Sequence, residues 1–159
     1  MAKKSKQSKT LPIYILNGPN LNLLGHREPE VYGTTTLAEI EAMCARQAKG
    51  HDLSIVFRQS NREGEVVDHL QEARTAGCAV IINPAGYGHT SIAILVSIQA
   101  LKIPVIEVHL SNIHKREPFR NHSYVSKGAT GIIMGLGAQG YLRAVDAVAE
   151  ILSSKSRSK

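Results

Sequence analysis

The 159-residue chain has the size of one domain and is long enough to bury a hydrophobic core without a disulfide or metal staple. Its longest apolar runs, around residues 78–82 and 92–101, are far shorter than the roughly 20 residues that span a bilayer, which argues against a membrane protein. The formal net charge is +6, but seven of the 19 basic residues lie in two tails, and the body between them holds 12 basic and 13 acidic residues, which argues against a nucleic-acid-binding fold.

The two tails, residues 1–10 and 153–159, are rich in serine and lysine and have no apolar periodicity. This composition predicts solvated, disordered tails on either side of one folded domain over residues 11–152. An alternative is that the tails bind nucleic acid or another anionic surface, which would make binding strongly dependent on salt. Cys44 and Cys78 lack C-x-x-C spacing, so we expect free thiols and a cytoplasmic location.

Strand and helix patterns alternate along the chain. Residues 11–16 form an apolar strand, and after a loop rich in Gly, Pro and Asn, Thr36 and Glu39 form a capping box at the start of a helix. Further strands are expected over residues 53–57, 78–82, 105–110 and 130–134, and further helices over 65–76, 91–101 and 139–152. Apolar strands separated by helices predict a flavodoxin-like, doubly wound, five-stranded parallel sheet, a three-layer α/β/α fold. Such sheets bind ligands at the carboxyl ends of their strands.

The loops at those strand ends carry most of the candidate site residues. The first holds Asn20, Arg27 and Tyr32 in about 16 residues, a length typical of a functional or a disordered segment. The loop after the third strand holds Asn83 and His89 among glycines, which also fits an ordinary turn with a polar cap.

The fourth strand and the loop after it contribute a second group. Glu107 and His109 are two residues apart, so they lie on one face of a strand that is otherwise apolar. They form either a structural pair or a carboxylate that orients an acid/base imidazole. Ser111, Arg116 and Arg120 follow at the same rim, where arginines four apart also fit a solvated face.

The sequence GLGAQG at residues 135–140 matches the letters of the dinucleotide motif G-x-G-x-x-G. A true motif of this kind opens a βαβ unit with an acidic residue at the next strand end, and no such strand follows here. We therefore interpret it as a tight turn between strand and helix. No cluster of His, Cys and carboxylate residues has metal-ligand spacing, so we expect no metal.

Four segments together resemble the type II 3-dehydroquinate dehydratases, or type II dehydroquinases. They are GPNLNLLGHREPEVYG, INPAGYGHTS, IEVHLSNIHKREPFRNHSY and GLGAQGY, in the family's order. The resemblance implies a flavodoxin-like fold without metal or cofactor, assembled as a dodecamer built from trimers. It also implies reversible dehydration of 3-dehydroquinate to 3-dehydroshikimate in the shikimate pathway.

The resemblance further implies a role for each site residue. Tyr32 would be the base that takes the C2 proton, Arg27 its activator, and Asn20 would position a water that stabilises the enolate. His109, oriented by Glu107, would protonate the leaving C1 hydroxyl. The remaining residues would bind substrate: Asn83, Ser111 and the amide near Leu110 around the carboxylate, His89 and Arg120 at the ring hydroxyls, and Arg116 holding the loop around Tyr32.

These residue types suit the chemistry. A proton next to a ketone needs a base, and a phenol with an ordinary pKa of about 10 is a poor base near neutrality unless a cation stabilises the phenolate. Arginine supplies a charge that does not titrate in this range. A departing hydroxide needs a proton, for which histidine is the best suited side chain near pH 7.

The sequence departs from the family at one notable position. Val96 stands where the family usually has an aspartate that reaches into a neighbouring subunit, so we expect apolar packing at that contact. Ala85 and Gly88 replace the more usual glycine and threonine. The alternative function is a flavodoxin-like module that binds FMN or phosphate at the helix starts near Thr90 and Gln139 without catalysis.

Overall fold

The computed structural model of the chain describes residues 10–158. All but Thr10 of the predicted N-terminal tail therefore lies outside the described residues. Within this range, none of the helices combines the length and the apolar character that crossing a membrane requires.

Five parallel strands form one sheet in the order β2-β1-β3-β4-β5. The strands are β1 (Ile13–Asn17), β2 (Ile55–Gln59), β3 (Ala79–Asn83), β4 (Val105–His109) and β5 (Gly131–Met134). This is the strand order of flavodoxin-like folds, so the predicted fold class is confirmed. β1, β3 and β4 are buried along their whole length, which explains why their sequences are mostly apolar. The buried polar exceptions are Asn17, Asn83, Glu107 and His109.

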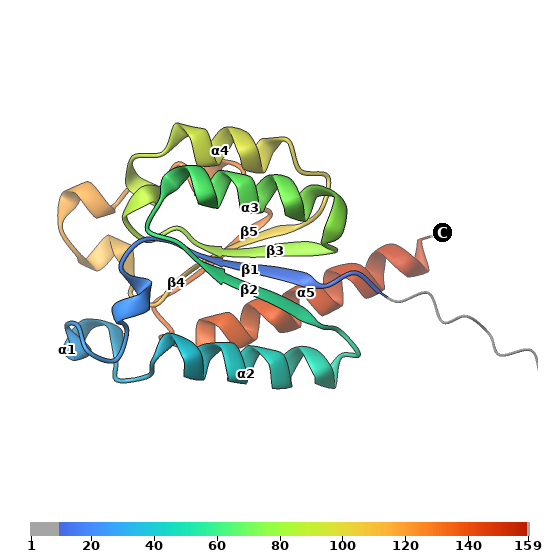
Figure 1. Cartoon of the computed structure of the whole chain (residues 1–159), viewed down its shortest axis with the longest axis horizontal. Helices are drawn as coiled ribbons and strands as arrows, with labels where there is room; N and C mark the ends of the chain where they lie inside the picture. Colours follow the sequence, from blue (N-terminus) through green and yellow to red (C-terminus); the bar gives the residue numbers. More distant parts are fainter. Residues whose placement is uncertain (1–9, 159) are drawn as a thin grey trace, which may run out of the picture.

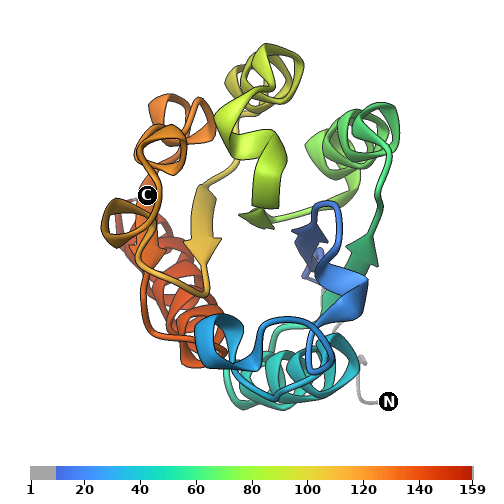
Figure 2. The ribbon, with the colours of Figure 1, turned by 90° about the vertical axis from the view of Figure 1, so that its left-hand side faces the viewer.

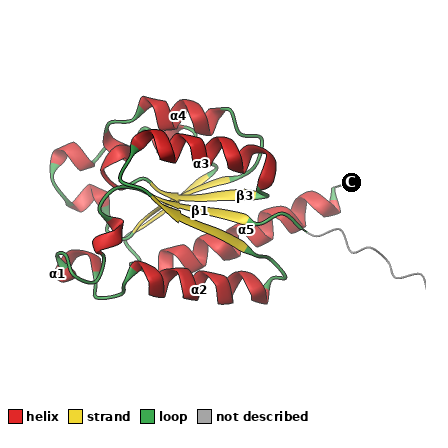
Figure 3. Ribbon diagram, viewed as in Figure 1, coloured by secondary structure: helices red, strands yellow, loops and turns green. Residues whose placement is uncertain are grey.

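Helices cover both faces of the sheet, as Figures 1 and 3 show. The helices α2 (Leu37–Gly50) and α5 (Gln139–Arg157) pack against each other on one face. The helices α3 (Glu63–Ala76) and α4 (Ile92–Gln99) pack together on the other face. Each pair encloses its own hydrophobic core, the first centred on Ile15 and Tyr141 and the second on Leu16 and Leu70.

Local signals set the helix boundaries. Thr36 accepts from the backbone N–H of Glu39 while Glu39 accepts from the backbone N–H of Thr36, which confirms the predicted capping box of α2. α3 stops at Gly77, whose N–H donates to the Ala73 carbonyl at 3.0 Å. Ser91 caps α4 by accepting from the N–H of Ile94 at 2.9 Å.

Two expectations differ from the structure. The tail predicted to be disordered from residue 153 continues α5 as far as Arg157. Serine side chains in this segment form hydrogen bonds to residues one turn earlier in the same helix. The Ser154 hydroxyl contacts the Glu150 carboxylate, and the Ser156 hydroxyl donates to the Leu152 carbonyl at 3.2 Å. Cys78 was expected inside a buried strand, but it immediately precedes β3 and is only half-buried.

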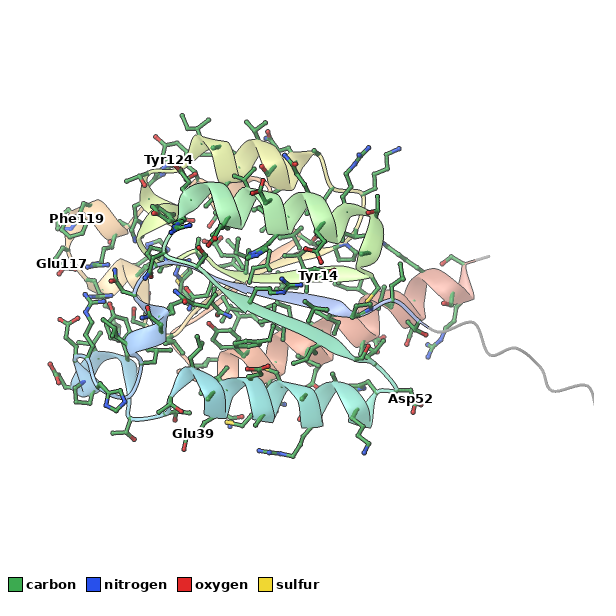
Figure 4. All side chains as sticks on the ribbon, in the orientation of Figure 1. Tyr14, Glu39, Asp52, Glu117, Phe119 and Tyr124 are labelled. Carbon is green, nitrogen blue, oxygen red and sulfur yellow. The ribbon has the colours of Figure 1, made fainter. Side chains whose placement is uncertain are left out.

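Because all strands are parallel, their carboxyl ends meet at one edge of the sheet, toward the viewer in Figure 2. The segments that follow β1, β3 and β4 lie around this edge. They contain the short helices η1 (Leu21–Leu23), α1 (Pro29–Tyr32), η2 (Ala85–His89), η3 (Ile113–Lys115), η4 (Pro118–Arg120) and η5 (Val125–Lys127). In Figure 4 the labelled Glu117 and Phe119 lie at this end, and Asp52 lies at the opposite end.

Candidate functional site

A pocket of about 150 Å³ opens between these segments. Ten predicted site residues line it: Asn20, Arg27, Tyr32, Asn83, His89, His109, Leu110, Ser111, Arg116 and Arg120. The remaining one, Glu107, is fully buried behind His109. The structure thus brings together residues from three separate strand ends. Pro19, Leu21, Leu24 and Ile113 add apolar walls that the sequence analysis did not assign to the site.

Tyr32 meets two arginines at the mouth of the pocket. Arg116 donates from Nη1 to the Tyr32 hydroxyl at 2.7 Å, and its guanidinium carbon is 5.1 Å from the centre of the ring. The guanidinium of Arg27 is 5.8 Å from the same ring centre and pairs with Glu28 at 3.4 Å. The Arg116 side chain is only 15% exposed and that of Arg27 is 44% exposed. Arg116 is therefore the cation in direct contact with the phenol oxygen.

Glu107 and His109 lie on the same face of β4, as their spacing predicts. His109 Nε2 and Glu107 Oε1 are 2.6 Å apart, and both side chains are almost completely shielded from solvent. Burial alone raises the pKa of the Glu107 carboxyl, but the hydrogen bonds from His109, Ser123 and Ser126 outweigh it, so the pKa lies below its ordinary value. Glu107 is thus a buried carboxylate bonded to an imidazole that lines the pocket.

Ser123 and Ser126 belong to the site although the sequence analysis did not select them. The Ser123 hydroxyl donates to Glu107 Oε1 at 2.5 Å, and the Ser126 hydroxyl donates to Oε2. They follow Glu107 by 16 and 19 residues, with Ser123 in an irregular loop and Ser126 in η5. Serine is common in such loops, so the only available signal was that a buried glutamate requires hydrogen-bond donors.

A second buried network supports Asn83 at the floor of the pocket. Its Nδ2 donates to the hydroxyl of Tyr141 at 3.0 Å, and Tyr141 donates to Asn17 Oδ1 at 2.6 Å. The Asn83 Oδ1 accepts from the N–H of Ala85 at 3.2 Å. Complete burial raises the pKa of the Tyr141 phenol, which therefore stays neutral. The network fixes the orientation of the Asn83 amide.

Two of the residues that line the pocket have a strained backbone. Asn20 and Ala85 both line the pocket and have left-handed backbone angles, with φ of 67° and 50°. The angle at Ala85 explains why glycine is the usual residue there in the family that the sequence resembles. Asn20 is held by its own N–H, which donates to Asn61 Oδ1 at 2.9 Å. Such strain is common where a backbone is shaped for a ligand.

His89 and Arg120 have partners within the protein. His89 Nδ1 is 2.6 Å from the His122 carbonyl oxygen, and because a carbonyl only accepts, Nδ1 carries the hydrogen. Arg120 Nε donates to Glu117 Oε2 at 2.8 Å. Backbone bonding at Glu117 and its two neighbouring arginines hold the pKa of the Glu117 carboxyl below its ordinary value. The exposed Glu117 thus offsets part of the positive charge at this rim.

The glycines of GLGAQG form the predicted turn between β5 and α5. Gly135 and Gly137 have φ of +86° and +58°, and their N–H groups donate to the carbonyls of His109 and Leu110. These bonds tie the turn to the end of β4. No group of three or more His, Cys, Asp or Glu side chains in residues 10–158 is arranged as a metal site.

The arrangement provides three kinds of chemistry around a single small cavity. A phenol in contact with a guanidinium can act as a base, and an imidazole backed by a carboxylate can take up or give a proton. Three arginines favour a ligand that carries negative charge. The pocket therefore suits proton removal and proton delivery on a small anionic molecule.

Comparison with known proteins agrees with this geometry. Residues 11–149 match the protein family described as Dehydroquinase class II. The 3-dehydroquinate dehydratase of Streptomyces coelicolor is 55% identical over 146 residues, 91% of this chain and 93% of its own length. That of Caulobacter sp. strain K31 is 57% identical over 143 residues, 90% of this chain and 97% of its own.

Solved structures give the same result. The type II dehydroquinase of Propionibacterium acnes superposes with a TM-score of 0.86 at 42% identity, covering 89% of this chain and 97% of its own. The type II dehydroquinase of Butyrivibrio crossotus gives 0.85 at 37% identity, covering 87% and 97%. The predicted resemblance is confirmed: the chain belongs to the class II dehydroquinase family.

Proposed function

We propose that the chain is an enzyme that reversibly dehydrates 3-dehydroquinate to 3-dehydroshikimate in the shikimate pathway. The observation that carries this proposal is the direct contact of Arg116 with the Tyr32 hydroxyl in the same pocket as the buried Glu107–His109 pair. Relatives that are 55% and 57% identical bear the name of this enzyme, which supports the same reaction here. The alternative of a non-catalytic FMN or phosphate module is not favoured.

In the proposed reaction, Tyr32 acts as a phenolate and removes the C2 proton, and the electron pair moves toward the C3 ketone to form an enolate. Arg116 stabilises the phenolate through its direct hydrogen bond, and Arg27 adds a second positive charge nearby. Asn20 positions the water that stabilises the enolate oxygen. The family resemblance implies Arg27 as the activator; the contact at 2.7 Å favours giving Arg116 the larger share.

The second half of the reaction breaks the bond between C1 and its hydroxyl. His109, backed by the Glu107 carboxylate, gives a proton to the departing oxygen, so that water leaves and the C1–C2 double bond forms. Asn83, Ser111 and the amide near Leu110 bind the substrate carboxylate and the C1 region. His89 and Arg120 bind the ring hydroxyls. Each of these side chains or backbone groups belongs to a residue that lines the pocket.

We infer further that the enzyme is a homo-oligomer, and propose a dodecamer built from trimers, working in the cytoplasm. The apolar face of α4 supports association, because Ile92 and Val96 are 58% and 57% exposed in a helix without charged residues. The absence of disulfides among the described cysteines fits a reducing compartment. No metal, cofactor, nucleic acid or membrane is part of the proposal.

A direct assay tests the proposed reaction. Purified protein mixed with 3-dehydroquinate, without added metal, should generate a conjugated enone that absorbs in the near ultraviolet, at a rate unchanged by a chelator. Tyr32→Phe should reduce this rate to background. Tyr14→Phe is the matched control, because the Tyr14 hydroxyl contacts Glu72 and Tyr14 does not line the pocket. Failure of the unsubstituted protein to produce the enone, or near-normal turnover by Tyr32→Phe, contradicts the proposal.

A further inference from the structure

The loop over residues 121–127 controls the environment of Glu107. Three side chains form hydrogen bonds to this carboxylate: His109 and Ser123 contact Oε1, and Ser126 contacts Oε2. Glu107 itself is fully buried, and its partners across the flanking strands are Ile82 and Ile132, which carry no polar side chain. Two of the three polar contacts that satisfy Glu107 therefore come from this loop.

The donors around Glu107 determine which nitrogen of the His109 ring carries a hydrogen. Each serine hydroxyl has one hydrogen to donate, and an ionised carboxylate is an acceptor only. With Glu107 ionised, the hydrogen in its bond to His109 must belong to the imidazole, so His109 Nε2 is protonated. Nδ1 is then the ring nitrogen of His109 that exchanges a proton with a ligand, and it carries that proton, in the imidazolium form, when His109 protonates a leaving hydroxyl.

The same loop also contacts the other histidine of the pocket. The His122 carbonyl accepts from His89 Nδ1, and the Tyr124 N–H donates to the Gly88 carbonyl at 2.8 Å. A Cβ at Gly88 would come within 3.2 Å of the Ser123 hydroxyl oxygen, so this contact is close as well. The loop is thus attached on both sides, to the His89 turn and to the Glu107 side chain.

We propose that Ser123 and Ser126 are positioning residues of the reaction: they hold Glu107 as a carboxylate in one orientation and thereby keep the hydrogen on His109 Nε2 and leave Nδ1 to serve the substrate. The inference rests on the proposed function for its catalytic consequence. Neither serine lines the pocket, so each acts through Glu107 and not on the substrate.

Removing a serine should therefore affect turnover more than substrate binding. Without one donor the charged form of Glu107 is less stabilised, and its protonation begins at a higher pH. The titratable side chain in contact with Glu107 is His109, whose Nε2 is 2.6 Å from Oε1. For Ser126→Ala we expect kcat about tenfold lower, KM within about twofold, and the acidic limb of the kcat profile moved upward by up to about one pH unit.

The experiment compares Ser123→Ala, Ser126→Ala and Ser126→Thr with the control Ser154→Ala. Ser154 also contacts a carboxylate, that of Glu150, but lies on the exposed side of α5 away from the pocket. Ser126→Thr keeps the hydroxyl and should keep most of kcat and the original pH profile. Alanine variants whose kcat, KM and acidic limb match those of Ser154→Ala overturn the proposal. A kcat loss without any shift of the acidic limb also overturns it.

Nitrogen-15 NMR of the histidine rings tests the inference without relying on activity. In the unsubstituted protein we expect the His109 signals of a ring protonated at Nε2, and in the alanine variants a shift toward the other tautomer or a mixture. A hydrogen on Nδ1 with Nε2 free in the unsubstituted protein overturns the positioning role, whatever the fate of the variants. If the protein does not convert 3-dehydroquinate, the proposed function fails, whereas the NMR result still decides the arrangement around Glu107.

Discussion

At the residue scale, many of the hydrogen bonds that hold the buried polar side chains of the site join segments far apart in the sequence. The Glu107–His109 pair is local, with both side chains on one buried face of β4, but its supporting partners are distant and leave no local pattern. Tyr141 contacts Asn17 across 124 residues, and Ser126 contacts Glu107 across 19. Such contacts follow from the fold, and a tyrosine or serine in the sequence gives no indication of them by itself.

The two arginines at Tyr32 provide a prediction at this scale. Arg116→Lys should lower kcat by roughly 10- to 100-fold, because the planar guanidinium that donates to the phenol oxygen is lost and lysine does not reproduce its geometry. Arg27→Lys should have a smaller effect, since its guanidinium is more exposed and also pairs with Glu28. Steady-state kinetics on 3-dehydroquinate measure both.

Arg62→Lys is the control for this pair, because Arg62 is 81% exposed and pairs with Glu65 on the surface. It should leave kcat unchanged. A larger loss in Arg27→Lys than in Arg116→Lys would return the main activating role to Arg27. It would mean that the Arg27 segment moves closer to Tyr32 when substrate binds.

At the scale of elements, the order of strands and helices was predictable because short, mainly apolar runs alternate with helix-period patterns, and because α2 and α4 begin at capping residues. The end of α5 was not, because composition alone favoured a solvated tail. The chain from residue 153 to Arg157 instead extends a helix whose earlier turns, with Val145 and Val148, are packed into the core. A helix that is anchored by tertiary contacts continues through residues that would not form one alone.

The loops that follow β1 and β3 approach each other closely at Gly18. Its N–H donates to the Asn83 carbonyl at 2.8 Å, and a Cβ at this position would lie 2.3 Å from the Pro84 carbonyl oxygen. Gly18→Ala must push the two backbones apart, so we expect a loss of about 1–3 kcal/mol in the free energy of unfolding and a clear fall in kcat/KM. Urea unfolding and the enone assay measure these effects.

Gly64→Ala is the matched control, since a Cβ there meets nothing within 4 Å and the residue lies in the first turn of α3. Its stability should be unchanged or slightly higher, because alanine favours a helix more than glycine does. Equal stability of the two variants would show that the loops adjust to the added carbon without cost.

Asp146 on α5 links this helix to α2 and gives a pH-dependent prediction. Its Oδ1 is 2.6 Å from Gln47 Nε2 and 2.7 Å from His51 Nε2, and its Oδ2 is 3.1 Å from Arg143. Partial burial alone raises the pKa of the Asp146 carboxyl. The hydrogen bonds and charges of these neighbours outweigh burial, so the pKa lies below 3.8, its ordinary value. Its contribution to stability is therefore complete above this ordinary value and is lost as the pH falls through the folded-state pKa.

Asp146→Asn should thus lower the free energy of unfolding near pH 6 by about 0.5–1 kcal/mol, a small value because the side chain is 30% exposed and screened by solvent. The difference from the unsubstituted protein should disappear in acid, below the folded-state pKa. Asp68→Asn on α3 is the control and should have no pH-dependent effect, because Asp68 is exposed. A difference that persists in acid would assign the effect to packing and not to charge. Denaturant unfolding over a series of pH values measures it.

At the scale of the whole molecule, the described residues bury two cores but leave several large apolar side chains in contact with solvent. Phe119, Ile132 and Leu136 are exposed at 65%, 44% and 55%, and Ile92 and Val96 on α4 at 58% and 57%. A sheet with helices on both faces was predictable from the sequence, whereas the exposure of these side chains becomes visible only once the helices are placed. These are the surfaces that other copies of the chain would cover in the proposed homo-oligomer.

The α4 face allows this to be tested. Val96 occupies the place of the usual family aspartate, so the contact between subunits there is expected to be apolar, and Val96→Lys would bury an unpaired charge in it. We expect the mass measured by analytical ultracentrifugation to fall from that of a large assembly to that of smaller species, with a stronger dependence on concentration. Gln71→Lys, which adds the same charge at an exposed position of α3, should leave the mass unchanged. A monomeric unsubstituted protein would contradict the proposed assembly, and an unchanged mass for Val96→Lys would exclude this face of α4 from it.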